Sequence, residues 1–248
     1  PVSATHSPGA TESVAPAITS IVAPRMLNAA QPENGAVAAM PEGAVVMACA
    51  TVPPAYARDA AARVEAEGLH YLDAPISGGA VKAAAGQLTV MASGTRDAFA
   101  RARPFLDAVT ERVFELGDEA GPGSTMKMVN QLLAGVHIAT AMEALALGIK
   151  SGLDPATVYE VITSAAGNSW MFENRVPHIL KGDYTPLSAV DIFVKDLNIV
   201  HQTGRELRFS MRVAGSALQQ FTAASGAGFG REDDSAVIKV YQRRSGIE

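Results

Sequence analysis

The feature that most constrains the fold of this chain is a long stretch that carries almost no charge. After Lys127, no aspartate, glutamate, lysine or arginine occurs until Glu143, and the residues between them favour a helix. A helix that is apolar on most of its faces is buried, so other elements must pack around it. The pattern predicts a single helix of about 28 residues, ~40 Å long, which is enough to join two domains.

Lys127 stands at the head of this helix, shortly after Gly121-Pro122-Gly123. An ammonium group in a buried apolar helix is costly unless it has partners or a task. One interpretation is a lysine whose charge reaches solvent at the helix end. The other is a proton-transfer lysine, because burial lowers a lysine pKa towards the range useful for acid and base catalysis. The surrounding residues must decide between them.

The composition is typical of a soluble globular protein and excludes several classes of partner. The chain has 248 residues, 48% apolar and 18% charged, which suits one large domain or two modest ones. Its net charge of −5 provides no basic surface for nucleic acid. No uninterrupted apolar run approaches the ~18 residues of a membrane span, so we expect no membrane partner.

A single cysteine, Cys49, rules out an intrachain disulfide and fits a reducing cytoplasm. Cys49 lies within the apolar run 44–50, so we interpret it as a small core residue rather than a nucleophile. Histidines and cysteines do not cluster as they would around a structural zinc ion. We therefore expect no metal site.

The first 40 residues do not form a recognisable structural unit. Residues 1–19 are rich in small and polar residues and show no period of two or of 3.6. Neither an initiator methionine nor a signal-peptide pattern occurs. The two interpretations are a flexible extension and a sequence that omits segments, and we favour the second.

Beyond residue 40, short apolar runs alternate with helical patterns. This alternation predicts an α/β sheet with parallel strand pairs. Strands are expected at 44–50, 69–74, 88–93 and 112–116, and helices at 54–68 and 96–109. Two loops, at 51–54 and 75–80, follow the carboxyl ends of strands, where binding residues are expected in such sheets.

After the long helix, the pattern becomes wholly helical. Asp154-Pro155 begins a helix, with the aspartate as its N-cap and the proline in its first turn. Helices are expected at 155–166, 170–180, 190–207, 212–225 and 234–241. We predict an α/β domain over residues 1–120 and an all-α domain over residues 121–248, which includes the long helix.

Three short motifs are weak indications of a site when each is taken alone. Ser77-Gly78-Gly79 follows a strand, and its glycines let backbone N–H groups approach an anion, although a tight turn is the simpler interpretation. Lys195-Asp196 lies within an expected helix, where such a pair usually forms a solvated face. Asn168-Ser169-Trp170 contains the only tryptophan, which packing alone would explain.

Taken together, the motifs closely resemble the β-hydroxyacid dehydrogenase family, which includes 3-hydroxyisobutyrate dehydrogenase and tartronate semialdehyde reductase. The resemblance runs from about residue 28 to residue 241. The matching motifs are 73–80, continuing through 86–91, then 121–127 and 195–197. It implies a Rossmann-type domain that binds NAD or NADP, a long interdomain helix, and an all-α domain that supports homodimers or homotetramers.

The resemblance also implies a reaction and assigns residues to it. The reaction is hydride transfer between a nicotinamide cofactor and a small hydroxy acid, with Lys127 as the catalytic acid and base. Substrate binding is implied for Ser77, Gly78, Gly79, Gln131 and Asn168, and cofactor binding for Leu27, Asn28, Thr51 and Lys195. Gln131 occupies a position where the family commonly has asparagine, four residues after the lysine and on the same helix face.

One expected motif is missing from the sequence. A Gly-x-Gly-x-x-Gly turn should hold the pyrophosphate of the dinucleotide near the N-terminus, and none occurs there. Gly226–Gly230 lies late, among helices, and does not follow a strand. We therefore expect that on the order of 30 residues, one βαβ unit, are absent before Asn28. A non-enzymatic alternative is an assembly module whose catalytic machinery has decayed.

The segment 165–194 looks most like the L-threonate dehydrogenase branch of the family. Asn168 and Ser169 offer polar contacts that a polyhydroxylated substrate would satisfy and a branched apolar one would leave unpaired. A four-carbon sugar acid is therefore the expected substrate. 3-Hydroxyisobutyrate and tartronate semialdehyde are the alternatives.

Overall fold

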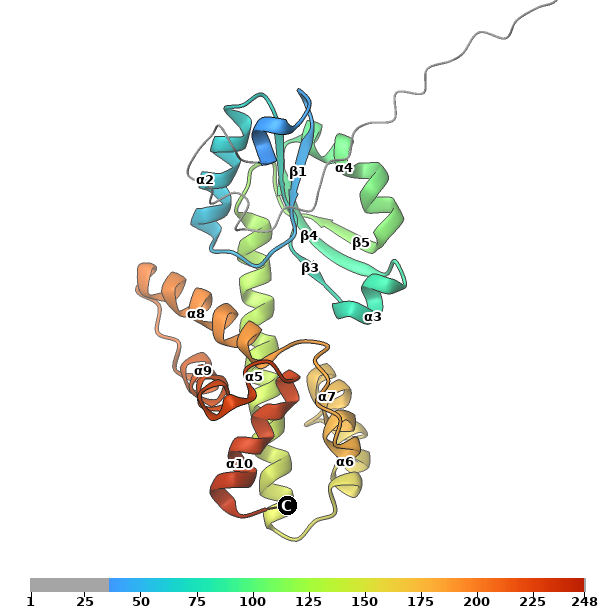
Figure 1. The fold of residues 1–248 in the computed structure, drawn as a ribbon, viewed down its shortest axis with the longest axis vertical. Helices are drawn as coiled ribbons and strands as arrows, with labels where there is room; N and C mark the ends of the chain where they lie inside the picture. The colour runs from blue at the N-terminus through green and yellow to red at the C-terminus, as the bar shows by residue number, and fades with distance from the viewer. Residues whose placement is uncertain (1–35, 248) are drawn as a thin grey trace, which may run out of the picture.

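The structure, a computed structural model, describes residues 36–247, which form two domains on one long helix (Figure 1). The expectations for Leu27, Asn28 and the glycine turn lie outside these residues. After a short 3-10 helix, η1 (Ala36–Ala39), the chain enters the sheet of the first domain.

Two parallel strand pairs make up most of the sheet. β1 (Val45–Ala48) pairs with β2 (His70–Asp73), and β4 (Leu88–Gly94) pairs with β5 (Thr110–Glu115). All four strands were expected close to these positions, and the predicted parallel pairs are present.

The two pairs are joined through an antiparallel ladder that was not expected. β2 and the two-residue β3 (Ile76–Ser77) both run antiparallel to β4 in one continuous register. Between them, the carbonyl of Pro75 accepts a hydrogen bond from Met91 N. The segment 75–80, expected as a loop, therefore extends this ladder and then begins the short helix α3 (Gly79–Ala84).

Helices cover both faces of the sheet (Figure 1). Successive residues of a strand point to opposite faces, so Val46 of β1 packs with Val64 of α2 (Pro54–Glu65). Met47 packs with the opposite group, which includes Leu106 of α4 (Arg96–Val109). Because both faces of β1 are buried, its sequence is a continuous apolar run rather than an alternating one.

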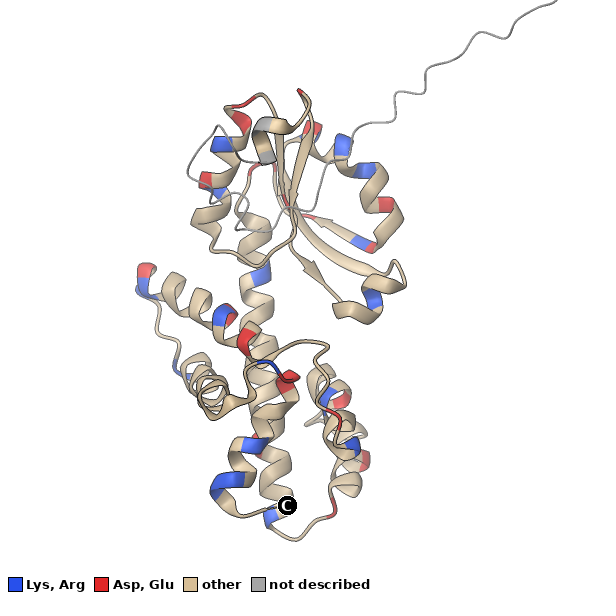
Figure 2. Ribbon diagram, viewed as in Figure 1, with Lys and Arg blue, Asp and Glu red and all other residues tan. Residues whose placement is uncertain are grey.

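The predicted long helix is α5 (Pro122–Lys150), which has 29 residues and runs from the sheet through the whole second domain (Figure 1). Figure 2 shows that charged residues are few along α5 and more frequent on the outer helices. Ile138, Met142 and Leu145 of α5 are buried at the centre of the helical domain.

The other helices of the second domain surround α5, close to the expected ranges. They are α6 (Pro155–Thr163), α7 (Trp170–Lys181), α8 (Val190–Glu206), α9 (Arg212–Ala224), η2 (Ser225–Phe229), η3 (Asp234–Val237) and α10 (Ile238–Ser245). Asp154 and Ser169 cap α6 and α7 by accepting hydrogen bonds from backbone N–H groups. α8 and α9 pack against α5 in one apolar core, to which they contribute Phe193, Leu197 and Phe221.

By length and composition alone, α5 could cross a membrane, since an 18-residue window within it has a mean hydropathy of 1.7. The core helix of a globular domain meets the same criterion. The packing of α6 to α10 around α5 buries 44% of that window, and the rest of it includes exposed apolar residues.

Candidate active site

Lys127 lies in the second turn of α5 and is only 8% exposed. Burial lowers its pKa from 10.5 to about 8; the neighbouring carboxylate of Asp196 opposes this change and the ammonium of Lys195 adds to it. Lys127 is therefore not a lysine that extends into solvent from a helix end. Its pKa lies where both protonation states are populated near neutral pH.

The first turn of α5 is fixed against the carboxyl end of β2 by Asp73. Its Oδ2 accepts hydrogen bonds from Gly121 N (3.0 Å) and Ser124 N (2.8 Å), and its Oδ1 accepts from Ser124 Oγ (2.7 Å). Ser93 Oγ of β4 accepts a further bond from Gly123 N (3.0 Å). A carboxylate at a helix N-terminus satisfies free backbone donors and the helix dipole at once. Burial nonetheless raises the pKa of Asp73.

Gly123 allows this close approach of α5 to the sheet. A Cβ atom at this position would lie 2.6 Å from the carbonyl oxygens of both Asp73 and Met91. Real Cβ atoms do not come so close, so glycine is required here. The position of Lys127, one turn later, is thereby tied to β2 and β4.

Gln131 lies at i+4 from Lys127 and is buried beside it. Its Nε2 donates to Asp196 Oδ2 at 2.6 Å, and its Oε1 accepts from Asn130 Nδ2 at 2.9 Å. The structure thus places the predicted Gln131 on the lysine face of α5, where it contacts a carboxylate of α8.

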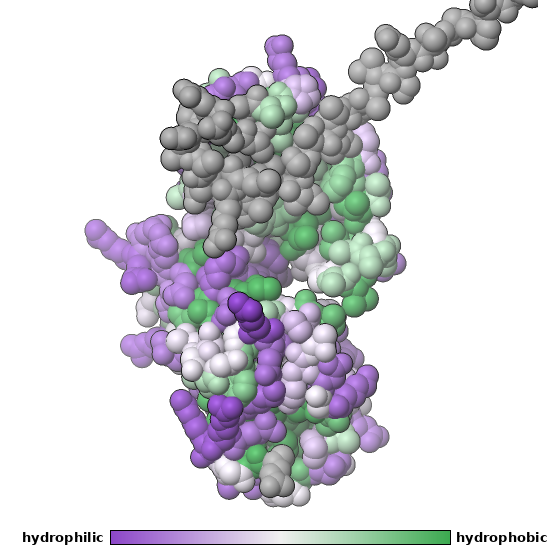
Figure 3. All heavy atoms as spheres, viewed as in Figure 1, coloured by the Kyte–Doolittle hydropathy of each residue, from purple (hydrophilic) through white to green (hydrophobic). Residues whose placement is uncertain are grey.

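Lys195 joins the helical domain to the sheet domain. Its Nζ lies 2.7 Å from Asp196 Oδ1 and donates to the carbonyl of Thr51 at 3.2 Å. Thr51 and Lys195, both predicted on the cofactor side, are therefore brought together across the domain junction. Figure 3 shows apolar residues at the surface around this junction.

Asp196 was missed as a site residue, because a Lys-Asp pair in a helix usually lies on a solvated face. The side chain is instead buried, 1% exposed. The sequence does contain a signal, since Phe193, Leu197 and Val200 repeat at helical spacing and place Asp196 near the buried face of α8. Asp73 belongs to the matching motif 73–80, but no role was predicted for it.

The Ser77-Gly78-Gly79 turn lies at the end of β3, with Gly78 at φ 133° and Gly79 at φ 67°. These are left-handed values that favour glycine. Ser77 pairs with Thr89 of β4, two residues before Met91, on which the start of α5 rests. One strand therefore carries both the predicted carboxylate-binding turn and the base of the lysine helix.

Asn168 is placed between α6 and α7, where its Nδ2 donates to the carbonyl of Thr163 at 3.4 Å. Its buried Oδ1 has no hydrogen-bond partner among the described residues. No described contact joins Asn168 to Lys127, Gln131 or Asp196. The structure therefore does not bring this residue into the same group.

The described residues fit the nicotinamide end of a dinucleotide. Thr51 follows the carboxyl end of β1, in a parallel pair, which is where open α/β sheets bind such ligands. Lys195 adds a half-exposed ammonium beside it. These two residues would hold that end of the cofactor, and the expected pyrophosphate site lies outside the described residues.

Comparison with known proteins decides the family. Residues 2–117 match the NAD binding domain of 6-phosphogluconate dehydrogenase, and residues 121–241 match the NAD-binding domain of NADP-dependent 3-hydroxyisobutyrate dehydrogenase. L-threonate dehydrogenase of Cupriavidus necator is 55% identical over 227 residues, covering 89% of this chain and 76% of the relative. The chain belongs to the β-hydroxyacid dehydrogenase family.

Other members of the β-hydroxyacid dehydrogenase family agree with this assignment. L-threonate dehydrogenase of Escherichia coli K12 is 53% identical and covers 84% of this chain and 69% of the relative. The crystal structure of a 3-hydroxyisobutyrate dehydrogenase from Salmonella typhimurium is 55% identical, with a TM-score of 0.81, and covers 83% of this chain and 72% of that one.

Membership of the family confirms four predictions. The fold is a Rossmann-type domain followed by an all-α domain, the chain is an oxidoreductase that acts on CH–OH groups, its substrate is a hydroxy acid, and its cofactor is NAD or NADP. The enzymatic interpretation therefore replaces the decayed assembly module.

Proposed function

We propose that this β-hydroxyacid dehydrogenase oxidises L-threonate or a closely similar four-carbon sugar acid, with Lys127 as general base and general acid. The observation that carries the proposal is the buried Lys127, with its pKa of about 8, on the helix that joins the two domains. Five relatives named L-threonate dehydrogenase are 51–55% identical to the chain, which supports this substrate class.

In the oxidation, neutral Lys127 takes the proton of the substrate hydroxyl while the hydride, with its electron pair, leaves the same carbon. The bound nicotinamide supplies the hydride acceptor. In the reverse reaction the ammonium of Lys127 donates its proton to the developing alkoxide. A pKa near 8 lets one residue serve in both directions.

The remaining predicted residues would position the substrate. The backbone amides of Ser77, Gly78 and Gly79 are suited to its carboxylate, since the glycines leave the backbone open to an anion. Gln131 has a further amide hydrogen that can reach a hydroxyl group. The role of Asn168 in substrate binding stays a prediction from the family resemblance, since its contacts lie with α6.

Replacing Lys127 by methionine tests the proton-transfer role, because it removes the ammonium and keeps most of the apolar stem. We expect oxidation of L-threonate to fall by at least ~100-fold, the usual contribution of a general base. Lys150→Met, at the exposed far end of the same helix, is the matched control and should retain activity. Undiminished turnover by the Lys127 variant would refute the role.

The same Lys127 variant should also be more stable below pH 8. Desolvation lowers the folded-state pKa to about 8 from 10.5, so the unfolded chain binds the extra proton between these values. The wild-type protein therefore gains stability as pH rises from 8 to 10.5. The methionine variant should exceed it by up to about 3 kcal/mol below pH 8 in urea unfolding, with the gain gone above pH 10.5.

Steady-state rates with four hydroxy acids test the substrate. We expect kcat/KM to be highest for L-threonate and lower for erythronate, glycerate and 3-hydroxyisobutyrate. A pocket built to hydrogen-bond hydroxyl groups loses free energy when a substrate leaves its polar groups unpaired. Preference for 3-hydroxyisobutyrate would contradict the proposal while leaving the role of Lys127 in place.

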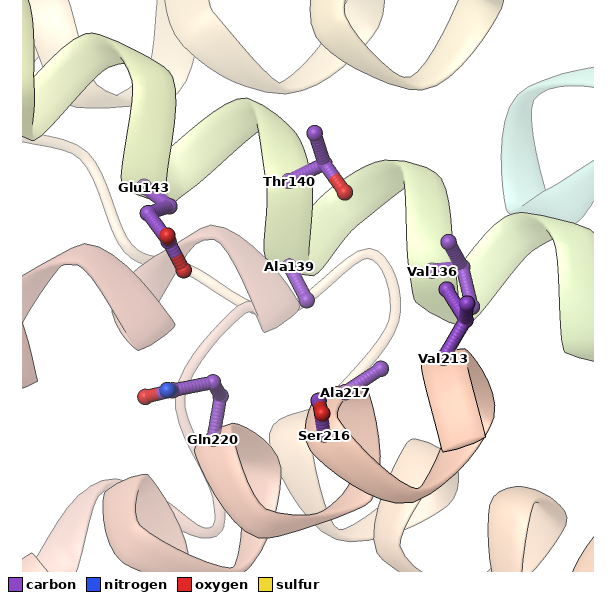
Figure 4. A pocket seen from close by; sticks show the side chains of 8 residues that line it. All are labelled: Val136, Ala139, Thr140, Glu143, Val213, Ser216, Ala217 and Gln220. Atoms are coloured by element: carbon purple, nitrogen blue, oxygen red, sulfur yellow. The ribbon is translucent and has the colours of Figure 1, made fainter. Parts of the chain in front are cut away.

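We also propose that the protein acts as a homodimer or homotetramer. Met126, Val129, Leu133 and Leu147 of α5 are exposed apolar residues that lie at helical spacing. Beside them, α5 and α9 form a groove (Figure 4). Its lining residues are Val136, Ala139, Thr140, Glu143, Val213, Ser216, Ala217 and Gln220. An exposed apolar surface of this kind suits a second copy of the chain.

A further inference from the structure

We propose that Asp196 is a positioning residue that orients Gln131 and balances the charge of Lys127 from the neighbouring helix α8. The inference rests on the function proposed above for Lys127. It goes beyond that function because it assigns a second residue, which touches neither reacting atom, to the control of the lysine.

The geometry gives Asp196 two separate partners. One carboxylate oxygen, Oδ2, accepts from Gln131 Nε2 of α5 at 2.6 Å. The other, Oδ1, forms an ion pair with the ammonium of Lys195 at 2.7 Å but accepts no hydrogen bond from the described residues. A carboxylate that is 1% exposed is costly unless its oxygens are engaged in this way. Asp196 is therefore held from two directions rather than by chance contact.

The bond to Asp196 fixes the orientation of the Gln131 amide. A carboxylate only accepts hydrogen bonds, so the NH₂ group of Gln131 must face it. Oε1 then points the other way, where Asn130 Nδ2 donates to it at 2.9 Å. One amide hydrogen of Gln131 takes no part in these bonds. Because the amide has a single orientation, this remaining hydrogen points in one fixed direction, available to a substrate hydroxyl group.

Asp196 and Lys195 act on Lys127 with opposite signs. The carboxylate raises the pKa of Lys127, and the ammonium lowers it, both against the larger effect of burial. Two further charged groups lie close to the start of α5, Asp73 of β2 and Arg58 of α2, while Asp59 and Arg63 of α2 pair with each other. Asp73 is engaged by Gly121 and Ser124, and Arg58 lies beside Gly121. β4 contributes no charge.

The test is a direct titration of Lys127 by NMR in protein labelled with ¹³C-lysine, with the resonance assigned from Lys127→Met. In Asp196→Asn, which keeps the shape and removes the charge, the titration should move down by about 1 pH unit. In Lys195→Met it should move up. Glu206→Gln removes a carboxylate from the exposed end of the same helix and is the matched control, in which we expect no shift.

Opposite shifts in the two variants support the inference, and any other combination overturns it. A residue with a merely structural role would change the melting temperature without moving the titration. Should Asp196→Asn fail to fold, Lys195→Met decides alone, because that side chain is 54% exposed and its loss does not threaten the core. An upward shift supports the inference and an unchanged titration refutes it.

A kinetic measurement separates this inference from the proposed function. The acidic limb of kcat/KM for oxidation should move with the NMR titration in Asp196→Asn. Full activity in Lys127→Met would remove the proposed function, yet the NMR shifts would still be measured. An inactive Lys127→Met combined with an unshifted Asp196→Asn would remove only the inference.

Discussion

At the scale of single residues, the proposed chemistry depends on Lys127, a lysine whose burial is costly. The cost is visible in its pKa, which desolvation lowers to about 8. A surface lysine would be almost wholly protonated at neutral pH and would make a poor base. The apolar surroundings of Lys127 are thus the physical cause of its lowered pKa, on which the proposed proton transfer depends.

This pKa gives the pH dependence of both directions of the reaction. Oxidation requires neutral Lys127, so kcat/KM should rise with pH and level off above about 8. Reduction requires the ammonium, so its rate should fall over the same range. Rates measured from pH 6 to pH 10 in both directions check this. If the rates of oxidation and reduction changed in the same direction with pH, one residue would not serve as base in one reaction and as acid in the other.

The residue scale also shows where the sequence was informative about the site. Lys127, Gln131, Thr51 and Lys195 were assigned by motif, and the structure connects the last three through Asp196. Asp196 itself was passed over because the bare pair Lys195-Asp196 is a common surface pattern. Its burial could have been predicted only from the apolar residues that surround it at helical spacing in the sequence.

At the scale of elements, the helices were predicted well because their signals are local. α4 was predicted over Arg96–Val109, as observed, and its N-terminus is capped by the Thr95 hydroxyl. The antiparallel ladder of β2 and β3 on β4 was not predicted. β3 has two residues preceded by Pro75, too few to show a period, and partner strands distant in sequence decide such pairings.

The contact between α5 and the sheet leads to a prediction at this scale. Gly123→Ala places a methyl group 2.6 Å from two backbone carbonyl oxygens, so α5 must shift away from β2 and β4. We expect a loss of about 1–3 kcal/mol in the free energy of unfolding, together with a lower kcat, because Lys127 shifts with its helix.

Urea unfolding and steady-state kinetics measure both effects of Gly123→Ala. Gly226→Ala is the matched control, since no heavy atom lies within 4 Å of the Cβ that it adds. Unaltered kcat in a destabilised Gly123 variant would show that the seating of α5 does not position the lysine.

At the scale of the whole molecule, the exposed apolar face of α5 and α9 should hold two copies together. Leu133→Arg introduces a charge into this face without touching the buried core, so we expect the assembly to dissociate towards monomer. Light scattering after size-exclusion chromatography measures the mass. Val161→Arg, at an exposed apolar residue of α6 on the other side of α5 in Figure 1, is the control. An unchanged mass for Leu133→Arg would exclude this face.

The two domains are joined by connections of very different strength. α5 is continuous through both, and its ends are fixed by Asp73 in the sheet and by the apolar core of the helical domain. Among the hydrogen bonds of the described residues, that from Lys195 to Thr51 is the one that joins α8 to the sheet domain. A single half-exposed bond contributes on the order of 1 kcal/mol. We therefore expect α8 to separate from the sheet domain more easily than α5 does, which would admit a dinucleotide while the helix that carries Lys127 stays folded.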